Sequence, residues 1–454
     1  MKVRQQPFRS PRNRGGGTFA NDSYTHQFID SPLPDKPSVP ASDVNAIDHL
    51  TAKKLLQFIG QPRVRFVLWD GSYVSSGVDE PLATLYFRDR ASLYLTLLRP
   101  ELYWGDLYSE GRVEVDGDLA VFLDTVYRGL DRGTGWAWLR WLNKSLGHRK
   151  IRNTFSKAAD NIHHHYDIGN DFYRLWLDEN AMQYTCAYYA DPAMTLEEAQ
   201  LAKMSHVCHK LQLKPGDRVV EAGCGWGGFA LYMAKNHGAR VKAYNISREQ
   251  VTYAREKAEA LGLANRVEYV LDDYRNISGE FDAFVSVGML EHVGPMHYPV
   301  LGQVMDGCLK PGGRGLIHSI GRNSPKPMNA WIERRIFPGA YPPTLREMMD
   351  IFESSRFSVL DVENLRMHYA RTLESWMQRY EMHADQVEKM MDERFVRTWR
   401  LYLSGSRAAF TSGRLQLFQV LFAREEDNDI PWSRAHQYTM HASLNRDGRT
   451  DADD

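Results

Sequence analysis

The sequence predicts an α/β protein built on a doubly wound, mostly parallel sheet, with a smaller α+β N-terminal domain. Two observations support this fold class. From about residue 155, strand-like apolar segments alternate with helical segments at the spacing of βα units. The first of these strands runs directly into a glycine-rich loop, as in sheets that bind ligands at the carboxyl ends of their strands.

Composition is that of an ordinary globular protein. The 454 residues are 43% hydrophobic and 25% charged with a formal net charge of −1, so no nucleic-acid partner is expected. The cysteines are too few and scattered for a disulfide framework or a CxxC zinc site, and they fit a reducing compartment. They are Cys186, Cys208, Cys224 and Cys308. No apolar run is long enough to span a bilayer, and the basic N-terminus lacks a secretory signal's apolar stretch, so we expect a cytoplasmic protein, soluble or peripheral to the membrane's inner face.

Both ends of the chain are expected to be tails. Residues 1–47 are rich in Pro, Gly, Ser and Arg and have no hydrophobic period, which predicts disorder. Their arginines would either be solvated or touch anionic lipid headgroups. Residues 425–454 are polar and are expected to form a C-terminal tail.

Residues 48–150 are expected to form the small N-terminal domain and a linker helix. Strands are predicted at 64–69, 83–89 and 111–118. Asp70-Gly71 is the turn signal of a hairpin, and Asp118 is the cap of a following helix. No cluster of chemically reactive side chains occurs here, so this domain is expected to bind or shelter a ligand such as a lipid.

The linker at 134–152 combines Trp138 and Trp141 with a basic cluster. This composition is typical of a helix lying in a membrane interface, and a helix packed between domains explains it equally well.

Residues 151–424 contain the main α/β region. Strands are expected at 218–223, 239–246, 266–273, 281–290, 313–320 and 415–424. The helix after the first strand ends at Gly238. The next helix begins after Ser247 as N-cap, with Gln250 at the capping-box position, and a third occupies 298–310.

The loop after the first strand reads Gly223-x-Gly225-x-x-Gly228. Glycines let the backbone turn tightly and approach a ligand, and the following helix presents unpaired N–H groups. This spacing also matches a dinucleotide fingerprint, so the loop alone leaves the cofactor open.

Neighbouring residues favour S-adenosylmethionine over NAD. A nicotinamide site needs an acidic residue about 20 positions on, and this chain has Asn245 there. Glu221 precedes the loop at a position suited to a cofactor ammonium group, and Asp272 and Asp273 offer acceptors for an adenine amine or a ribose.

Five stretches in order carry a more specific resemblance. They are 163–189, 219–228, 245–250, 286–298 and 317–321. Together they resemble the cyclopropane-fatty-acyl-phospholipid synthases and the related mycolic acid cyclopropane synthases. The resemblance covers about 160–424 and implies a class I methyltransferase-like sheet. It also implies an enzyme that uses S-adenosylmethionine to convert a cis double bond of a phospholipid acyl chain into a cyclopropane.

The resemblance also implies roles for individual residues. Tyr184 and Thr185 would flank the methionine end of the cofactor, and Gly223 and Gly225 would line it. The ribose side would be Asn245 and Gln250, and the adenine side Asp272 and Asp273. The family's bound bicarbonate would be held by Cys186, Glu291, His318, Tyr402 and the backbone of Ile320.

The chemistry fits such a site. An alkene is a poor nucleophile, so it must be aligned with the sulfonium methyl group while competing nucleophiles are excluded. Methyl transfer leaves a carbocation, and a base must then remove a proton from the added methyl group to close the ring. A bound bicarbonate is a milder acceptor than a nucleophilic side chain. Aromatic faces would stabilise the cation.

Some positions depart from the family pattern. Ser406 stands where family members often have a cysteine. Asn245 stands where a threonine is more usual, and this small polar side chain should still reach a ribose hydroxyl. The run His163-His164-His165 is not expected to bind a metal, because consecutive residues point in different directions.

Three hypotheses follow. The first is the cyclopropane synthase. The second is a methyltransferase that produces a methylene- or methyl-branched acyl chain from the same phospholipids. The third is a catalytically silent lipid- or adenosylmethionine-binding protein, which predicts a decayed base site. Acyl chains at a membrane surface are the expected partner, and a homodimer is possible by family resemblance.

Overall fold

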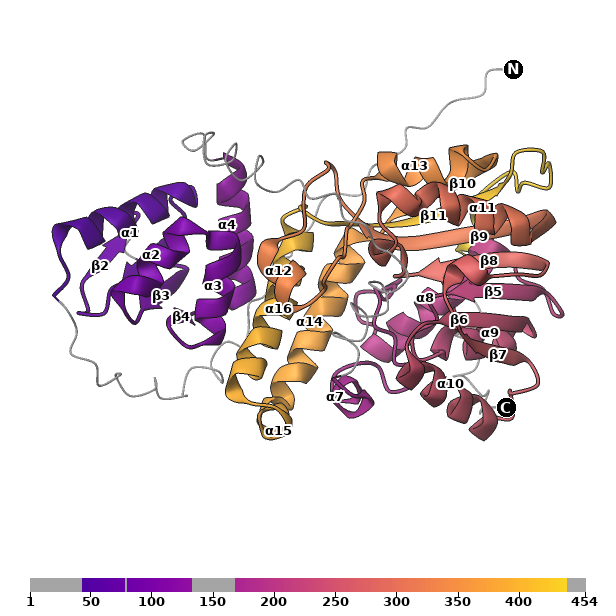
Figure 1. Ribbon diagram of the computed structural model, residues 1–454, viewed down its shortest axis with the longest axis horizontal. Helices are drawn as coiled ribbons and strands as arrows, with labels where there is room; N and C mark the ends of the chain where they lie inside the picture. The colour runs from indigo at the N-terminus through magenta and orange to yellow at the C-terminus, as the bar shows by residue number, and fades with distance from the viewer. Residues whose placement is uncertain (1–42, 78–79, 133–167, 439–454) are drawn as a thin grey trace, which may run out of the picture. The chain divides into compact units, whose positions relative to one another are not determined.

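A computed structural model of the protein describes residues 43–77, 80–132 and 168–438 (Figure 1). The predicted linker helix with Trp138 and Trp141 lies outside these residues, as do His163-His164-His165 and most of both predicted tails. Two sheets carry the described part of the chain, a four-stranded one and a seven-stranded one.

The four-stranded sheet has the order β2-β1-β3-β4. Its strands are β1 (Val64–Val67), β2 (Tyr73–Ser75), β3 (Ala83–Phe87) and β4 (Val113–Asp116). Its helices are α1 (Ala46–Phe58), α2 (Arg90–Leu98), α3 (Pro100–Ser109) and α4 (Leu119–Arg132). The predicted hairpin is confirmed, since β1 and β2 pair antiparallel around Asp70-Gly71. Asp118 caps α4 as expected, because its Oδ1 accepts from the Val121 N–H at 2.9 Å.

The seven-stranded sheet has the order β10-β11-β9-β8-β5-β6-β7, which Figure 1 shows as a stack. Its strands are β5 (Arg218–Ala222), β6 (Arg240–Asn245), β7 (Val267–Leu271), β8 (Phe281–Val287), β9 (Leu309–Gly321), β10 (Phe357–Asn364) and β11 (Gln416–Arg424). All neighbours pair in parallel except β11, which is antiparallel to both β9 and β10. The predicted doubly wound, mostly parallel sheet is confirmed.

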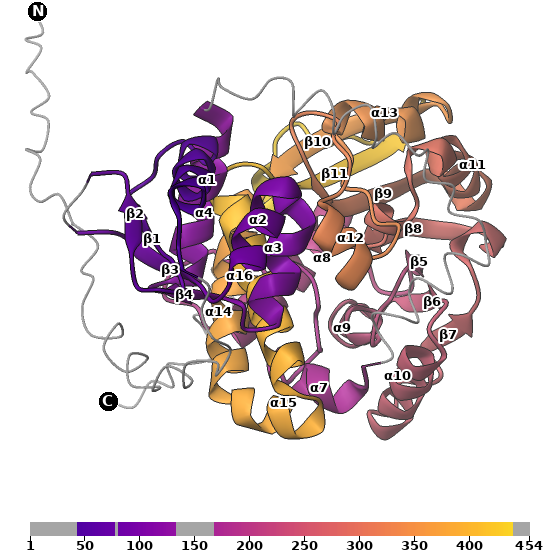
Figure 2. The same ribbon diagram turned by 60° about the vertical axis from the view of Figure 1, so that its left-hand side comes forward.

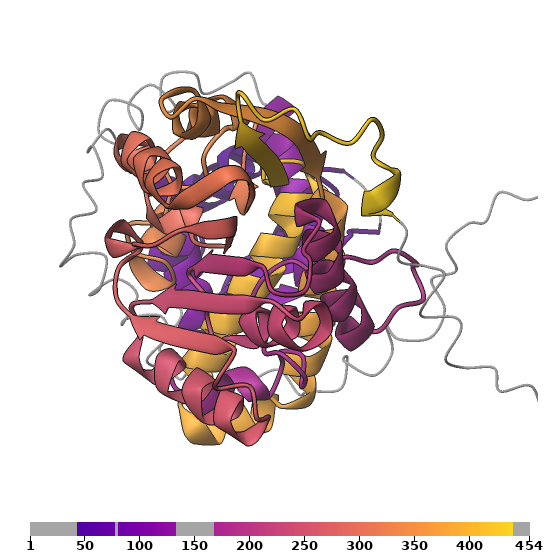
Figure 3. The same ribbon diagram turned by 90° about the vertical axis from the view of Figure 1, so that its right-hand side faces the viewer.

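Helices cover both faces of this sheet (Figure 3). Alternate residues of β5 point to opposite faces, so Val219 and Val220 belong to different hydrophobic clusters. Val219 packs in one cluster with α8 (Leu196–Leu211), α9 (Gly228–His237) and α10 (Arg248–Ala260). Val220 packs in the other with α11 (Tyr298–Cys308) and α13 (Leu345–Glu353). The strand order changes direction between β5 and β8, where a doubly wound sheet binds its ligand.

A helical layer follows β10. It contains α14 (Arg366–Met382), α15 (Ala384–Met390) and α16 (Glu393–Thr411), and α14 and α16 lie side by side (Figure 2). Two short helices, α7 (Asn170–Arg174) and α12 (Ala330–Arg335), precede this layer in the chain. Ion pairs join these helices to the N-terminal sheet region: Arg397 bonds Glu114 at 3.1 Å, and Arg335 bonds Asp106 at 2.9 Å.

Besides several helices, such as α1, α8 and α14, the structure adds a strand and a packed C-terminal segment to the sequence analysis. It contains β10, for which the sequence analysis expected no strand, at the sheet edge beside β11. It also places residues 425–438, assigned to the polar tail, against the body of the protein. Gln437 is buried with its carbonyl against His206 Nδ1 at 3.1 Å, and Arg434 bonds Asp361 at 2.7 Å. The domain boundaries remain predictions.

Candidate active site

The glycine loop lies at the carboxyl end of β5, where the strand order reverses. Gly223, Gly225 and Gly227 have φ angles of 84°, 52° and 79°, which residues with a Cβ rarely adopt. The Gly223 N–H donates to the Tyr244 carbonyl at 2.9 Å, which ties the loop to the end of β6. A Cβ on Gly228 would lie 2.2 Å from the Ala181 carbonyl oxygen, so the sequence requires glycine here for close packing.

Glu221, just before the loop, is buried, and its Oε2 has no hydrogen-bond partner among the described residues. Burial raises the pKa of Glu221 to about 8, against the opposing charge of Lys203. A buried carboxylate with an unsatisfied oxygen is costly unless a ligand completes it. The position therefore fits a ligand that carries an ammonium group.

Lys203 on α8 is a buried residue of the site that the sequence analysis did not identify. Its Nζ donates to Gln183 Oε1 and, at 3.1 Å, to Thr185 Oγ1. Burial lowers the pKa of Lys203 to about 8. A lysine on a helix is ordinarily read as solvent-exposed, and no motif distinguishes this one.

The segment around Thr185 lies against the end of β8. Gln200 of α8 donates to the Thr185 carbonyl at 2.9 Å, and a Cβ on Gly288 would lie 3.0 Å from Thr185 Cγ2. The glycine loop packs against Met289, the residue after Gly288, because a Cβ on Gly223 would lie 2.9 Å from Met289 Cβ. The structure therefore brings the predicted cofactor loop, Thr185 and the start of the predicted base site together.

Asn245 and Gln250 are both buried at the end of β6 and the start of α10. Asn245 Nδ2 donates to the Gly225 carbonyl at 3.1 Å and to Gln250 Oε1 at 2.8 Å, while its Oδ1 accepts from the Ser247 N–H at 3.2 Å. The placement of Asn245 on the ribose side remains a prediction; since its two amide hydrogens are used within the protein, a contact with a ribose hydroxyl would fall to Oδ1 as acceptor.

Gln250 is the better ribose donor. Its Nε2 has no hydrogen-bond partner among the described residues, and Asn245 holds its Oε1, so the amide N–H₂ group is left for a ligand. The same contact explains why the predicted capping box forms only in part. The Ser247 side chain accepts from the Gln250 N–H, but the Gln250 side chain bonds Asn245 instead of returning to Ser247.

The two aspartates after β7 differ in their contacts. Asp273 Oδ1 accepts from the Arg275 N–H at 2.9 Å and its Oδ2 bonds the Arg275 guanidinium at 3.1 Å, so both of its oxygens are engaged. Asp272 uses Oδ1 to accept from the Asp273 N–H and from Asn276 Nδ2, both at 2.7 Å. Of the two predicted adenine-side acceptors, the geometry favours Asp272.

Glu291 lies in a 3₁₀ turn, Leu290–His292, just after β8. Its Oε1 accepts from the Ile320 N–H at 2.6 Å, while its buried Oε2 has no hydrogen-bond partner in the described part of the chain. Burial raises the pKa of Glu291 to about 7. A carboxyl poised near neutrality with one unsatisfied oxygen is suited to moving a proton.

The role of the Ile320 backbone remains a prediction, and the structure shows one partner of its N–H group. The resemblance gives the Ile320 backbone to bicarbonate, whereas its N–H donates to Glu291 in this structure. Cys186 is similar: its buried thiol donates to the Ala187 carbonyl at 3.1 Å, and burial keeps its pKa well above the usual range. A contact between Cys186 and a ligand would therefore fall to its backbone.

His318 is buried on β9, two residues before Ile320. Its Nδ1 lies 3.1 Å from Gln419 Nε2, and its Nε2 has no hydrogen-bond partner among the residues described. Burial lowers the pKa of His318 to about 3, so the ring is neutral at physiological pH. Glu291 and His318 thus present two unsatisfied polar atoms near the same end of β9.

Tyr184 and Tyr402 meet directly, since their hydroxyl oxygens lie 2.8 Å apart. Tyr402 lies on α16. The rings of Trp176, Trp376 and Tyr173 surround Tyr184 with centroids 5.2, 5.4 and 5.5 Å away. These aromatic side chains, which sequence alone could not select, form a wall between α7, α14 and α16.

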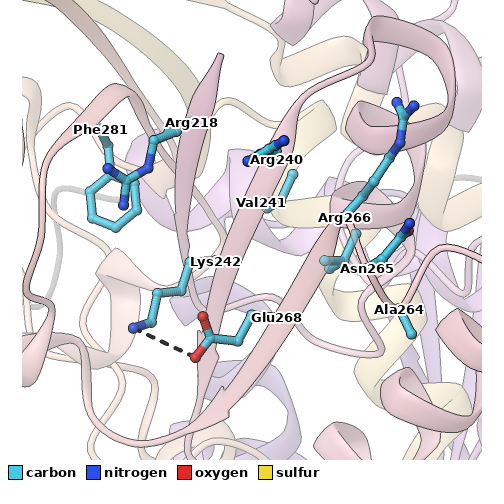
Figure 4. A pocket seen from close by; sticks show the side chains of 10 residues that line it. Arg218, Arg240, Val241, Lys242, Ala264, Asn265, Arg266, Glu268 and Phe281 are labelled. Carbon is cyan, nitrogen blue, oxygen red and sulfur yellow. Dashed lines mark ion pairs between the residues drawn. The ribbon is translucent and has the colours of Figure 1, made fainter. Parts of the chain in front are cut away.

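A pocket of about 200 Å³ elsewhere on the sheet is unrelated to this site (Figure 4). It lies at the amino ends of β5 and β6, lined by Arg218, Arg240 and Lys242 among others, at the edge opposite the glycine loop. Within the described ranges, no group of three or more His, Cys, Asp or Glu side chains is placed to hold a metal ion.

Comparison with known proteins gives consistent results. Residues 153–420 match the family described as mycolic acid cyclopropane synthetase. A probable fatty acid methyltransferase of Pseudomonas putida is 33% identical over 399 residues, which cover 83% of this chain and 96% of that protein. The cyclopropane-fatty-acyl-phospholipid synthase of Escherichia coli K12 is 41% identical over 271 residues, covering 60% of this chain and 69% of that protein.

Solved structures agree. A crystal structure of the mycolic acid cyclopropane synthase CmaA1, complexed with SAH and CTAB, superimposes with a TM-score of 0.55 and 27% identity, over 58% of this chain and 97% of that one.

Proposed function

The chain belongs to the mycolic acid cyclopropane synthetase family, and from this premise we propose that it closes a cyclopropane ring on the cis double bond of an unsaturated phospholipid acyl chain. Membership makes it an S-adenosylmethionine-dependent methyltransferase that acts on lipid acyl chains. The phospholipid substrate and the cyclopropane product are the proposal. The observation that carries it is the buried, half-satisfied Glu291 carboxyl beside the glycine loop.

The cofactor side of the site fits S-adenosylmethionine. Glu221 Oε2 would accept from its ammonium group, Gln250 Nε2 would donate to the ribose and Asp272 would accept from the adenine amine. When bound, the cofactor supplies an electrophilic methyl group on a sulfonium. The close contact of Gly223 with Met289 shows that the glycine loop lies against the start of the turn that carries Glu291, so a cofactor held by this loop would have its methionine end near that turn.

The base side fits a small oxyanion such as bicarbonate. His318 Nε2 and Glu291 Oε2 are both buried and unsatisfied among the described residues, so a ligand that bonds both would remove two desolvation penalties. Glu291 would accept the ligand's O–H, and the Tyr402 hydroxyl, held by Tyr184, would donate to it.

The chain's own residues then perform three tasks. The wall formed by Tyr173, Trp176 and Trp376 keeps water from the carbocation left on the acyl chain when the methyl carbon bonds to the alkene and the C–S bond breaks. Glu291, with His318 and Tyr402, would hold a small anion that supplies a proton acceptor, and the Glu291 carboxylate would accept the proton that this anion passes on as the ring closes. A pKa near 7 lets this carboxyl release the proton again at neutral pH.

The test is mass spectrometry of fatty acid methyl esters from a host that expresses this chain. A product one methylene heavier than its monounsaturated parent, and resistant to mild hydrogenation, supports a cyclopropane. The Glu291→Gln variant should yield none of it while binding S-adenosylmethionine normally. If the protein is catalytically silent, expression of the unmodified chain should produce no new fatty acid methyl ester.

A second product remains a candidate because of one specific observation. The relative that matches the chain over the greater length, 399 residues against 271, is named as a fatty acid methyltransferase. A methylene- or methyl-branched acyl chain would arise if the proton left from a different carbon. Such a product hydrogenates readily to a methyl-branched chain, so the same measurement separates the two.

Access to phospholipid acyl chains requires contact with a bilayer surface, and we propose that the chain binds it peripherally. No helix among the described residues is long and apolar enough to cross a membrane. Replacing Trp138 and Trp141 with alanine should weaken binding to anionic vesicles in a flotation assay. Unchanged binding would remove the 134–152 segment from this proposal.

A further inference from the structure

A row of three buried or half-buried polar side chains crosses the last three strands of the sheet. His318 on β9 and Gln419 on β11 are direct cross-strand partners, and Gln419 in turn faces Glu363 on β10. Directly opposed residues point to the same face of a sheet, so the three side chains lie side by side. The row ends at His318, in the proposed base site.

Helix α8 contributes a buried ammonium group to this row. Lys210 Nζ donates to Glu363 Oε2 at 2.6 Å and to Gln419 Oε1 at 2.8 Å. One turn earlier on the same helix, His206 Nε2 lies 2.8 Å from the same Glu363 oxygen. Lys210, His206 and Gln419 are at most 1% exposed, whereas the Glu363 side chain is 19% exposed. The bonds from Gln419 to Lys210 and to His318 are therefore the ones shielded from water.

The direction of these bonds is fixed by chemistry. An ammonium group can only donate, so the Gln419 atom facing Lys210 must be its carbonyl oxygen. The other end of the amide, which faces His318 Nδ1 at 3.1 Å, is then the N–H₂ group, which can only donate. His318 Nδ1 must accept, and a neutral imidazole that accepts at Nδ1 carries its proton at Nε2.

We propose that Gln419, oriented by Lys210, is a positioning residue that holds His318 in the Nε2–H tautomer, so that His318 donates to the anion of the base site. This inference rests on the proposed function for the identity of that anion. The tautomer itself follows from the protein's own contacts.

The alternative tautomer would act in the opposite sense. With the proton on Nδ1, the Nε2 atom would offer a lone pair in place of a hydrogen, and the proposed site would contain two unsatisfied acceptors, His318 Nε2 and Glu291 Oε2, which would repel an anion. Because His318 is neutral, its ring carries only one proton, so one ring nitrogen donates and the other must accept. Burying a lysine and a carboxylate costs folding free energy because both charges lose hydration. Fixing one tautomer of His318 would be a functional reason for the protein to contain this network.

The first test is a direct observation of the tautomer. Solid-state ¹⁵N spectra of the full chain with labelled histidine distinguish protonated from unprotonated ring nitrogens, and a His318→Gln variant assigns the signals of His318. We expect His318 to be neutral and protonated at Nε2. Protonation at Nδ1, or a mixture of tautomers, would overturn the inference, whatever the enzyme's product.

Two variants then test the cause. In Gln419→Glu, the carboxylate beside Lys210 accepts at both oxygens, so the proton of His318 should move to Nδ1. In Lys210→Met, the amide of Gln419 is free to turn, so both tautomers should appear. Gln416→Glu is the matched control, because it adds the same charge to the same strand at a side chain that bonds Asn364 and the Gly413 carbonyl instead. It should leave the His318 spectrum unchanged.

Turnover separates this inference from the proposed function. We expect Gln419→Glu to lower kcat by about two orders of magnitude, the loss typical of removing one preorganised donor, with little change in S-adenosylmethionine affinity. An unaltered spectrum in both Gln419→Glu and Lys210→Met would refute the control of His318 by Gln419. A shifted tautomer with full turnover would instead confirm that control and refute the donor role of His318 in the base site.

Discussion

The Glu291→Gln substitution should abolish turnover and at the same time stabilise the folded protein. The side chains have nearly the same shape, and glutamine keeps an Oε1 that can accept from the Ile320 N–H. What changes is the buried second oxygen, which becomes a neutral amide and no longer carries a charge into a site without a hydrogen-bond partner among the described residues.

The magnitude follows from the pKa. Burial raises the pKa of Glu291 from 4.5 to about 7. Such a change corresponds to about 3 kcal/mol of folding free energy once the pH is above both values. The sign is clear: below about pH 4.5 the carboxyl is protonated in both states, and stability is lost as the pH rises until the folded carboxyl ionises. The variant lacks this loss, so its advantage should grow with pH.

The assay is the free energy of unfolding by denaturant for parent and variant at about pH 5 and about pH 8. We expect the variant to gain less than about 1 kcal/mol at the lower pH and up to about 3 kcal/mol at the higher one. Glu221→Gln is the matched control, since burial raises the pKa of Glu221 to about 8. It should show the same trend while losing cofactor affinity in place of turnover. A variant that is less stable than the parent at both pH values, or that still turns over, would refute the reasoning.

Other predictions concern single contacts. Tyr402→Phe removes the 2.8 Å hydroxyl contact with Tyr184 and should lower stability by about 1 kcal/mol. It should also abolish most of the turnover, and thermal unfolding and product formation measure the two effects. Unchanged turnover would show that Tyr402 does not belong to the anion site. Gly228→Ala would place a Cβ 2.2 Å from a backbone oxygen and should lower the Tm, whereas Gly307→Ala, with open space around its Cβ, should raise it slightly. Lys203→Met should weaken S-adenosylmethionine binding in a calorimetric titration, because the bond to Thr185 is lost; full affinity would make Lys203 structural only.

The fold was largely predictable because its signals are local. Each parallel strand of the α/β region is a short apolar run bounded by glycine or polar residues. This pattern can be recognised from neighbouring residues alone, without knowledge of the tertiary structure. The edge strand β10 lacks this signal. Its sequence Phe357–Asn364 is only intermittently buried, since one side of an edge strand faces solvent, so its hydrophobic pattern is weak.

The site was predictable only where residues lie in motifs. Glu291, His318 and the glycine loop belong to recurring stretches, and the structure brings them together. Lys203 and Lys210 could not be found, because a lysine's burial depends on packing that no local pattern encodes. The same applies to Asn245, whose position at the end of β6 predicts a ribose contact. Only the folded structure shows that its amide N–H₂ group also bonds Gly225 and Gln250.

The reversed strand β11 has a consequence for how the protein is made. Among the strands of the described residues it comes last in the sequence, yet it lies between β9 and β10, so β10 is synthesised before its partner in the sheet. Gln419 reaches His318 only when β11 inserts, and these two residues are 101 positions apart in the sequence. Pairings between such distant segments form late in folding. A nascent chain that already contains the glycine loop, Glu291 and His318 would therefore lack the contact that orients His318, and it would acquire this contact only after β11 has also been made.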